Sequence, residues 1–438
     1  MIASLVANRH RGARAAASAP MLSLLAPDAV RQVRAFHRSI EGYAPTPLLR
    51  LRNLASRLGV KSIYVKDESF RFGLNAFKVL GGSYAIASTL AGRLGVDISR
   101  MPYERFISNE VRQRLGDVTF VTATDGNHGR GVAWTAHKLR QKCVVHMPRG
   151  AAIERLENIR ALGANADIVD MNYDDAVRLS SREADEHGWI LVQDTAWPGY
   201  EDIPRAIIQG YTTLLAETVE QLEAEHGGER PTHVFVQAGV GSLATAVAGY
   251  LANVYGSSSE GGPAIVVVEP GNAACIFETL RAEDGAIRVV KGDLGTIMAG
   301  LACGEPVTVG IDLLANCVDF VVSLPDYVAA QGMRVLSNPS RARDGDPAAP
   351  PRGPADRSAD PRIISGESGA APLGFAHEVL TRPELADAKR ELRIDRESVL
   401  YFISTEGDTD RAGFEAIVYD GAHAHPAARQ RAATGSAI

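Results

Sequence analysis

The stretch from Lys66 to Ala85, KDESFRFGLNAFKVLGGSYA, decides how we interpret this chain. Within it, Lys78 follows Phe77, after a turn of Gly and Asn and before the paired glycines Gly81 and Gly82. The apolar neighbours would bury the stem of the lysine, and burial disfavours its charged form. Such an amine is nucleophilic near neutral pH and can form a Schiff base with a carbonyl. The alternative is a surface lysine whose stem covers a packed helix, and this stretch alone does not separate the two.

Composition limits the classes of protein to consider. A chain of 438 residues exceeds one ordinary core, so we expect two domains or lobes. Its 45% hydrophobic and 22% charged residues are typical of a globular protein. A formal net charge of −6 gives no electrostatic reason to expect nucleic acid or an anionic membrane as a partner. No apolar run approaches the length that crosses a bilayer.

The cysteines predict no metal site. Cys143, Cys275, Cys303 and Cys317 lie far apart, without the spacing of metal ligands, which fits a reducing compartment. A disulfide between two of them, for example Cys275 and Cys303, stays open at this point. We expect a cytoplasmic protein.

Three segments are predicted to lie outside the core. Residues 1–27 contain no acidic residue but carry three arginines, Arg9, Arg11 and Arg14, so their composition resembles a mitochondrial transit peptide. We favour a disordered leader, with a mitochondrial location as the alternative. Residues 338–362 hold six prolines and almost no apolar residues, which predicts a disordered insertion. Residues 421–438 predict a flexible, solvated tail.

Between these segments the hydrophobic pattern alternates between strand and helix. Helices are expected at 51–58, 82–94, 129–140, 152–162, 174–187, 204–226 and 243–254, and strands at 62–66, 118–122, 143–147, 166–169, 189–193, 232–237 and 264–269. This alternation predicts an α/β fold in which helices cover both faces of a mainly parallel sheet. Ligands of such sheets bind beyond the carboxyl ends of the strands, so the loops there are the candidate site.

The first of these loops is ATDGNHGRG, from Ala123 to Gly131. Its three glycines stand between a strand and a helix start, where free N–H groups would hold an anion such as a substrate carboxylate. The candidate substrate-binding residues are therefore Thr124, Asp125, Gly126, Asn127 and His128. The alternative is helix capping by Asp125 and Asn127 and a structural role for His128.

The second loop is QAGVGSLA, from Gln237 to Ala244. Gly239, Val240, Gly241 and Ser242 would form a phosphate cup at a helix start, although short glycine loops also serve as tight turns. The spacing is not GxGxxG, and no acidic residue follows at the distance that a dinucleotide site requires. A Rossmann dehydrogenase is therefore disfavoured.

Three further loops carry polar groups. Asp194 follows a strand in QDTAWPGYEDIP, where it can act as a base or cap the next helix. SGESGA, residues 365–370, is a turn before an apolar run. In FISTEGDTD, residues 402–410, Ser404 and Thr405 end a strand, and a hydroxyl there could face a pyridine nitrogen. Pyridoxal phosphate has such a nitrogen, and it is the commonest cofactor that forms a Schiff base with lysine in amino-acid chemistry.

Together these strings resemble the fold type II family of pyridoxal phosphate enzymes, which includes threonine and serine dehydratases, and within it the branch of diaminopropionate ammonia-lyases. The resemblance runs from about Phe36 to about Gly421. It implies two open, twisted, mainly parallel sheets in a large domain (28–88 plus 203–420) and a small domain (89–202), with the cofactor between them. It also implies a homodimer.

The resemblance implies a role for each candidate residue. Lys78 would be the Schiff-base lysine, with Phe77 packed against the cofactor ring. Asn127 would contact the phenolic oxygen, residues 239–242 would hold the phosphate, and Ser404 or Thr405 would meet the pyridine nitrogen. Asp125 and Asp194 would remove the Cα proton, each suited to one enantiomer of the substrate.

The implied reaction is the elimination of ammonia from 2,3-diaminopropionate, giving pyruvate and a second ammonia. Dehydratases of this fold carry a small residue at the position of Asp125, whereas a second ammonium on the substrate favours a carboxylate there. A serine or threonine dehydratase of the same fold is one alternative. A relative that binds the cofactor without catalysis is another.

Overall fold

The structure is a computed structural model that describes residues 3–124, 126–340 and 359–426. Its larger sheet has seven strands in the order β1-β10-β9-β8-β11-β3-β2, and its smaller sheet has four in the order β6-β5-β4-β7. The strands are β1 (Ser4–Ala7), β2 (Leu48–Arg50), β3 (Ser62–Asp67), β4 (Thr119–Ala123), β5 (Lys142–Met147), β6 (Asn165–Ile168), β7 (Ile190–Leu191), β8 (His233–Gln237), β9 (Ala264–Pro270), β10 (Phe320–Leu324) and β11 (Val399–Ser404).

Parallel pairing dominates both sheets. Every neighbouring pair is parallel except β1 with β10 and β2 with β3, which lie at the two edges of the larger sheet. The smaller sheet is parallel throughout. All residues of β3, β8 and β11 are buried, as expected for parallel strands that are covered on both faces.

Helices surround the two sheets. They are α1 (Ala15–Leu24), α2 (Pro27–Ser39), α3 (Arg52–Leu58), α4 (Val79–Arg93), α5 (Tyr103–Phe106), α6 (Asn109–Leu115), α7 (Asn127–Lys138), α8 (Ile153–Arg160), α9 (Tyr173–His187), α10 (Asp202–Glu225), α11 (Ser242–Tyr255), α12 (Cys275–Arg281), α13 (Thr308–Cys317), α14 (Asp326–Ser337), α15 (Glu367–Thr381), α16 (Ala386–Leu392) and α17 (Arg411–Val418), with 3₁₀ turns η1 (Glu68–Gly73), η2 (Ile98–Arg100), η3 (Ser258–Glu260), η4 (Ala299–Leu301) and η5 (Pro383–Leu385).

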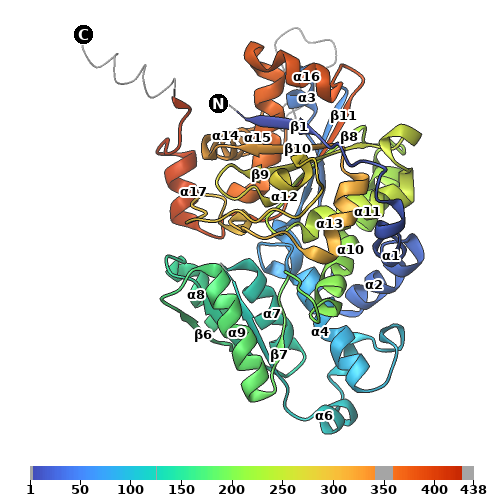
Figure 1. Cartoon of the computed structure of the whole chain (residues 1–438), viewed down its shortest axis with the longest axis vertical. Coiled ribbons are helices and arrows are strands. Elements are labelled where there is room, and N and C mark those ends of the chain that lie inside the picture. Colours follow the sequence, from blue (N-terminus) through green and yellow to red (C-terminus); the bar gives the residue numbers. More distant parts are fainter. Residues whose placement is uncertain (1–2, 125, 341–358, 427–438) are drawn as a thin grey trace, which may run out of the picture.

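The core forms two layers, one on each face of the larger sheet. Along β3, Tyr64 faces one hydrophobic cluster while Ile63 and Val65 face the other, which is the alternation of a strand. Figure 1 shows α7, α8 and α9 gathered around the smaller sheet in a separate lobe, and α4 packs against both α7 and α10. The predicted domain boundary at residue 88 falls inside α4, a helix that contacts elements of both lobes.

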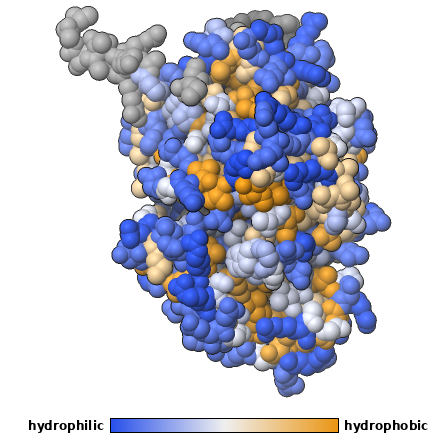
Figure 2. Space-filling view, viewed as in Figure 1, coloured by the Kyte–Doolittle hydropathy of each residue, from blue (hydrophilic) through white to orange (hydrophobic). Residues whose placement is uncertain are grey.

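The face of the molecule in Figure 2 is mainly hydrophilic. Hydrophobic residues gather near its middle, around the junction of the two lobes. In the part of the chain that the structure describes, no helix has the length and apolar character to cross a bilayer.

The prediction of a disordered leader is wrong for the described residues before Asp28. Strand β1 pairs antiparallel with β10, and the Asn8 side chain donates hydrogen bonds to Ala315 O and Val318 O at 2.9 and 2.7 Å. Leu25 is fully buried against Gly249. Composition could not reveal this, because every one of these partners lies more than 200 residues along the chain.

The predicted insertion and tail are each ordered in part. Asp360 N donates to Ser340 O at 2.9 Å, and the Asp360 carboxylate accepts from the backbone N–H groups of Asn53 and Leu54 at 3.0 and 2.8 Å. These bonds bring the two ends of the insertion together; its middle, 341–358, lies outside the described residues. In the tail, Ala422 O accepts from Arg334, so residues 421–426 pack on the fold. Residues 427–438 lie outside the description.

Candidate active site

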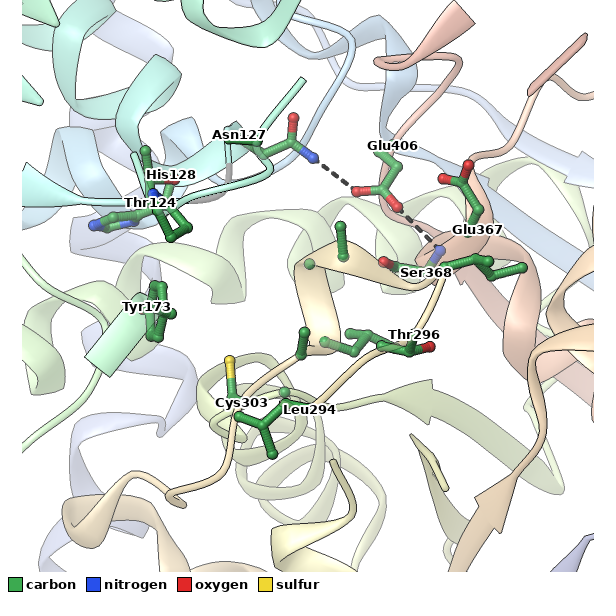
Figure 3. Close-up of a pocket in the computed structure, with 18 of the residues that line it drawn as sticks. Thr124, Asn127, His128, Tyr173, Leu294, Thr296, Cys303, Glu367, Ser368 and Glu406 are labelled. Carbon is green, nitrogen blue, oxygen red and sulfur yellow. Dashed lines mark hydrogen bonds between the residues drawn. The ribbon is translucent and has the colours of Figure 1, made fainter. Parts of the chain in front are cut away.

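A cavity of about 830 Å³ lies where the two sheets meet. Its walls come from both lobes: the start of α4, the loop after β4, the loop after β8, and the ends of β7 and β11. Figure 3 shows the cavity with Asn127 and His128 on one side and Glu367, Ser368 and Glu406 on the other. The loops that the sequence singled out therefore converge on one place.

Lys78 and Asp194 meet inside this cavity. Lys78 precedes the first residue of α4, and its Nζ forms an ion pair with Oδ2 of Asp194, which follows β7. The Lys78 side chain is 20% exposed and that of Asp194 only 4%. Burial by itself would raise the pKa of Asp194, but the charges of Lys78 and His128 outweigh it and lower that pKa to about 2. The carboxylate is thus held in its ionised form.

Glycines let the helices around Lys78 approach closely. A Cβ on Gly81 would lie 2.6 Å from a ring carbon of Tyr211 in α10, and a Cβ on Gly131 would lie 2.9 Å from Cα of Val79. Any larger residue would push α7 or α10 away from the start of α4. The first contact explains Gly81, whereas a Cβ on Gly82 would have only ordinary contacts, 3.6 Å from Val132.

The loop after β4 is held by its own side chains. Thr124 Oγ1 accepts from the N–H groups of Gly126 and Gly129 at 2.9 and 3.1 Å, and both Thr124 and Asn127 line the cavity. His128 also lines it, but its Nε2 donates to Val192 O at 2.8 Å, which fixes the ring in place. Asp125 lies outside the described residues.

Asn127 forms a hydrogen bond with a residue of the other lobe. Its Nδ2 donates to Oε2 of Glu406 at 2.7 Å, and Oε1 of Glu406 accepts from the backbone N–H of Ser368 at 3.2 Å (Figure 3). Because a carboxylate can only accept, the orientation of the Asn127 amide is fixed. Glu406 therefore joins the loop after β4 to the start of α15.

The loop from Gly239 to Ser242 has the features of an anion site. It leads into α11, a helix of 14 residues, and Gly241 has a φ of 100°, which favours glycine. A Cβ on Gly239 would lie 3.1 Å from Cys303 Sγ, so no side chain fits there without movement. Ser242 Oγ donates to Asp194 O at 2.8 Å and couples this loop to the ion pair.

The structure separates two residues that the sequence left equivalent. Thr405 lines the cavity, and its Oγ1 accepts from Nε2 of Gln237 at 2.8 Å. Ser404 is fully buried and is not part of the cavity wall. Of the two hydroxyls, only that of Thr405 is placed to meet a ligand.

Sequence reasoning missed several polar residues of the cavity, among them Glu367, Glu406 and Gln237. Burial, followed by the nearby Glu406, raises the pKa of Glu367 to about 7. Both glutamates stand inside strings that the sequence analysis quoted, SGESGA and FISTEGDTD, but nothing local marks them. Glu406 meets Asn127, which lies 279 residues away in the sequence.

The cysteines are free thiols in the structure. Burial, followed by the charge of Glu269, raises the pKa of the Cys275 thiol well above its usual value. Cys303 lines the cavity beside Gly239, and no disulfide joins it to Cys275.

The residues present fit pyridoxal phosphate. The cavity offers an amine for an aldehyde, a glycine cup for a phosphate, an amide for a phenolic oxygen and a hydroxyl for a ring nitrogen. Two buried polar atoms, Oε1 of Gln237 and the hydroxyl of Tyr211, have no hydrogen-bond partner among the described residues. A site with unpaired buried polar groups is one that a ligand can complete.

Comparison with known proteins agrees with this geometry. The model of the family described as "Pyridoxal-phosphate dependent enzyme" matches residues 40–341. The chain belongs to this family. Its cofactor is pyridoxal 5′-phosphate, and its fold is fold type II, as the sequence predicted.

Several relatives of this family member are named diaminopropionate ammonia-lyases. The diaminopropionate ammonia-lyase of Escherichia coli K12 is 48% identical over 391 residues, which cover 89% of this chain and 91% of that protein. The holo crystal structure of the Escherichia coli enzyme has a TM-score of 0.84 at 44% identity, covering 96% of this chain and 98% of that one. Another, in complex with an aminoacrylate-PLP azomethine reaction intermediate, has a TM-score of 0.82 at 44% identity over 97% and 99% of the two chains.

Proposed function

We propose that this chain is a diaminopropionate ammonia-lyase, which eliminates ammonia from 2,3-diaminopropionate to give pyruvate and a second ammonia. The observation that carries the proposal is the pairing of Lys78 with the buried Asp194 carboxylate, in a cavity that also holds Glu367 and Glu406. A substrate with two ammonium groups suits a cavity rich in carboxylates, because opposite charges attract strongly where water is scarce. The similarity to diaminopropionate ammonia-lyases over nearly the whole chain supports it.

The geometry supports an assignment of the cofactor-binding residues. When bound, pyridoxal phosphate supplies an aldehyde and an electron-accepting ring that makes the Cα proton of an amino acid more acidic. Lys78 is the residue that would join the aldehyde, and residues 239–242 would hold the phosphate. Phe77 packs on Tyr211 with ring centroids 4.7 Å apart, so it offers a fixed apolar surface for the ring. Asn127 would contact the phenolic oxygen and Thr405 the ring nitrogen.

Asp194 is suited to accept a proton. Its pKa is low because the Lys78 ammonium lies against it, despite burial that acts in the opposite direction. Once Lys78 no longer carries a positive charge, burial is left as the main influence, and the carboxylate becomes a stronger base. A neutral Lys78 amine would therefore leave Asp194 better able to remove a Cα proton. Asp125, between Thr124 and Gly126, would serve the opposite enantiomer.

The binding of the substrate carboxylate is assigned to the loop after β4. α7, a helix of 12 residues, begins at Asn127, and the N-terminus of a helix favours an anion. The two ammonium groups would then face the carboxylates of the cavity.

A coupled pyruvate assay on both enantiomers of 2,3-diaminopropionate tests the proposal. We expect the wild type to turn over diaminopropionate far faster than serine or threonine. Asp194→Asn should lose most activity on one enantiomer, and Asp125→Asn most activity on the other. Equal turnover of serine would favour a serine or threonine dehydratase instead. A bound cofactor that yields no pyruvate from any amino acid would favour a non-catalytic relative.

The oligomeric state and the cellular location of the protein remain proposals. We infer a homodimer from the family resemblance, and sedimentation of the holoenzyme would test it. We also propose a cytoplasmic location rather than a mitochondrial one; residues 4–24 include a strand of the larger sheet and a packed helix.

A further inference from the structure

We propose that Gln237 is a positioning residue that turns the Thr405 hydroxyl into a hydrogen-bond donor, so that the ring nitrogen of the cofactor stays unprotonated. Gln237 ends β8, directly before the phosphate loop, and Thr405 follows β11, the next strand in the sheet. The inference deepens the proposed function, because it concerns the same cofactor site. No sequence motif assigns a role to Gln237.

The orientation of the Gln237 amide is fixed by a backbone carbonyl. Its Nε2 lies 3.0 Å from Ile403 O and 2.8 Å from Thr405 Oγ1. A carbonyl oxygen can only accept a hydrogen bond, so the atom of Gln237 that faces it has to be the nitrogen. Exchanging the amide oxygen and nitrogen would place two oxygens against each other at that distance.

This orientation decides what Thr405 does with its own proton. An amide nitrogen donates and does not accept, so Oγ1 of Thr405 is the acceptor in the bond with Gln237. The hydroxyl hydrogen is therefore directed elsewhere. Among the described residues no acceptor takes it, and Thr405 lines the cavity. The hydroxyl thus presents a donor to whatever occupies the cavity.

Burial makes the arrangement rigid. Gln237 and Thr405 are each 2% exposed, so water does not compete for their bonds. Oε1 of Gln237 is left without a partner, which is unfavourable for a buried oxygen. The amide nevertheless keeps this orientation, because the alternative would lose both of its donated bonds.

A donor at this position selects one protonation state of a pyridine ring. An unprotonated ring nitrogen has a lone pair that accepts from Thr405. A protonated ring nitrogen would itself be a donor, and it would repel the donor hydrogen of the Thr405 hydroxyl. Gln237 therefore acts on the cofactor through Thr405.

The protonation state can be read directly. We would bind pyridoxal phosphate labelled with ¹⁵N in its ring to the wild-type holoenzyme and record the ¹⁵N chemical shift. The shift expected is that of an unprotonated pyridine. The shift of a protonated pyridine would overturn the inference, and if the same protein still released pyruvate from diaminopropionate, the proposed function would stand without it.

A double-mutant cycle tests the part played by Gln237. Gln237→Met keeps the length of the side chain but removes its donors, and Thr405→Val removes the hydroxyl. Each should raise the dissociation constant of pyridoxal phosphate about 2- to 10-fold, the range expected for one hydrogen bond. In the Thr405→Val background, Gln237→Met should add little. Additive effects would contradict the inference. Ser404→Ala, which removes a hydroxyl outside the cavity, should leave the constant unchanged.

Discussion

At the scale of single residues, Glu367 and Glu406 show how two neighbouring carboxylates come to differ. Glu406 accepts hydrogen bonds from Asn127 and from the backbone of Ser368. Glu367 is 8% exposed, and burial together with the charge of Glu406 raises its pKa to about 7. Ionising Glu367 in the cofactor-free chain therefore costs stability, and this predicts an unusual dependence on pH.

We predict that Glu367→Gln stabilises the cofactor-free chain at pH 8 but not at pH 4. The pKa of Glu367 is about 4.5 when unfolded and about 7 when folded. Below 4.5 the carboxyl is neutral in both states, and above 7 it is charged in both, which costs the folded state about 3 kcal/mol. Stability should thus fall as pH rises between these values, and the glutamine variant should lack this loss. Urea unfolding at the two pH values measures it.

Glu406→Gln is the matched control for that prediction. It also replaces a buried carboxylate of the same cavity, but it disturbs a group with two hydrogen bonds, so it should lower stability at pH 8. If both variants shifted stability in the same direction, the difference between the two carboxylates would be contradicted.

At this scale the sequence identified those cavity residues that their immediate neighbours in the chain mark out. Lys78 stands before paired glycines, Asp194 follows an apolar strand, and residues 239–242 open a helix, so each could be placed by its neighbours. Gln237 could not be given a role in this way. Its function depends on Thr405, 168 residues away.

At the scale of elements, the bond between Asn127 and Glu406 joins two parts that belong to different sheets. We predict that Glu406→Ala reduces the rise in melting temperature that pyridoxal phosphate produces, because Asn127 would lose its fixed orientation toward the cofactor. Thermal melts with and without cofactor measure the rise. An unchanged rise in Glu406→Ala would contradict a positioning role for this bond.

The first helix of the chain gives a second prediction at this scale. Leu25 follows α1 and is fully buried against Gly249 of α11. Leu25→Ala should therefore lower the free energy of unfolding by about 3 kcal/mol, the usual cost of a cavity at a buried leucine. Ser23→Ala, at an exposed position beside it, should change little. If Leu25→Ala were equally neutral, the segment would not be part of the core.

The elements that the sequence predicted are those with long, regular patterns. All seven helices expected between residues 51 and 254 are present, with boundaries shifted by a few residues. Strands β1, β2 and β10 were not foreseen. They have four, three and five residues, and β1 and β2 form the edges of the sheet, where pairing depends on distant segments.

At the scale of the whole molecule, residues from both lobes form the site. Lys78 and Thr405 come from elements of the larger sheet, while Asp194 and Asn127 follow strands of the smaller one. Neither lobe alone brings an amine, a base and a phosphate cup together. The sequence indicated this convergence only through the general rule that loops at the carboxyl ends of parallel strands share one edge.

The account depends on Lys78 as the amine that holds the cofactor, with carboxylates nearby to take a proton from a doubly charged amino acid. The most direct test measures pyruvate and ammonia released from 2,3-diaminopropionate by the wild type and by Lys78→Ala, both supplied with pyridoxal phosphate. We predict two ammonia molecules for each pyruvate from the wild type, and at least a hundredfold slower release from the variant, about 3 kcal/mol or more in barrier height. Equal rates from the two proteins would contradict the account.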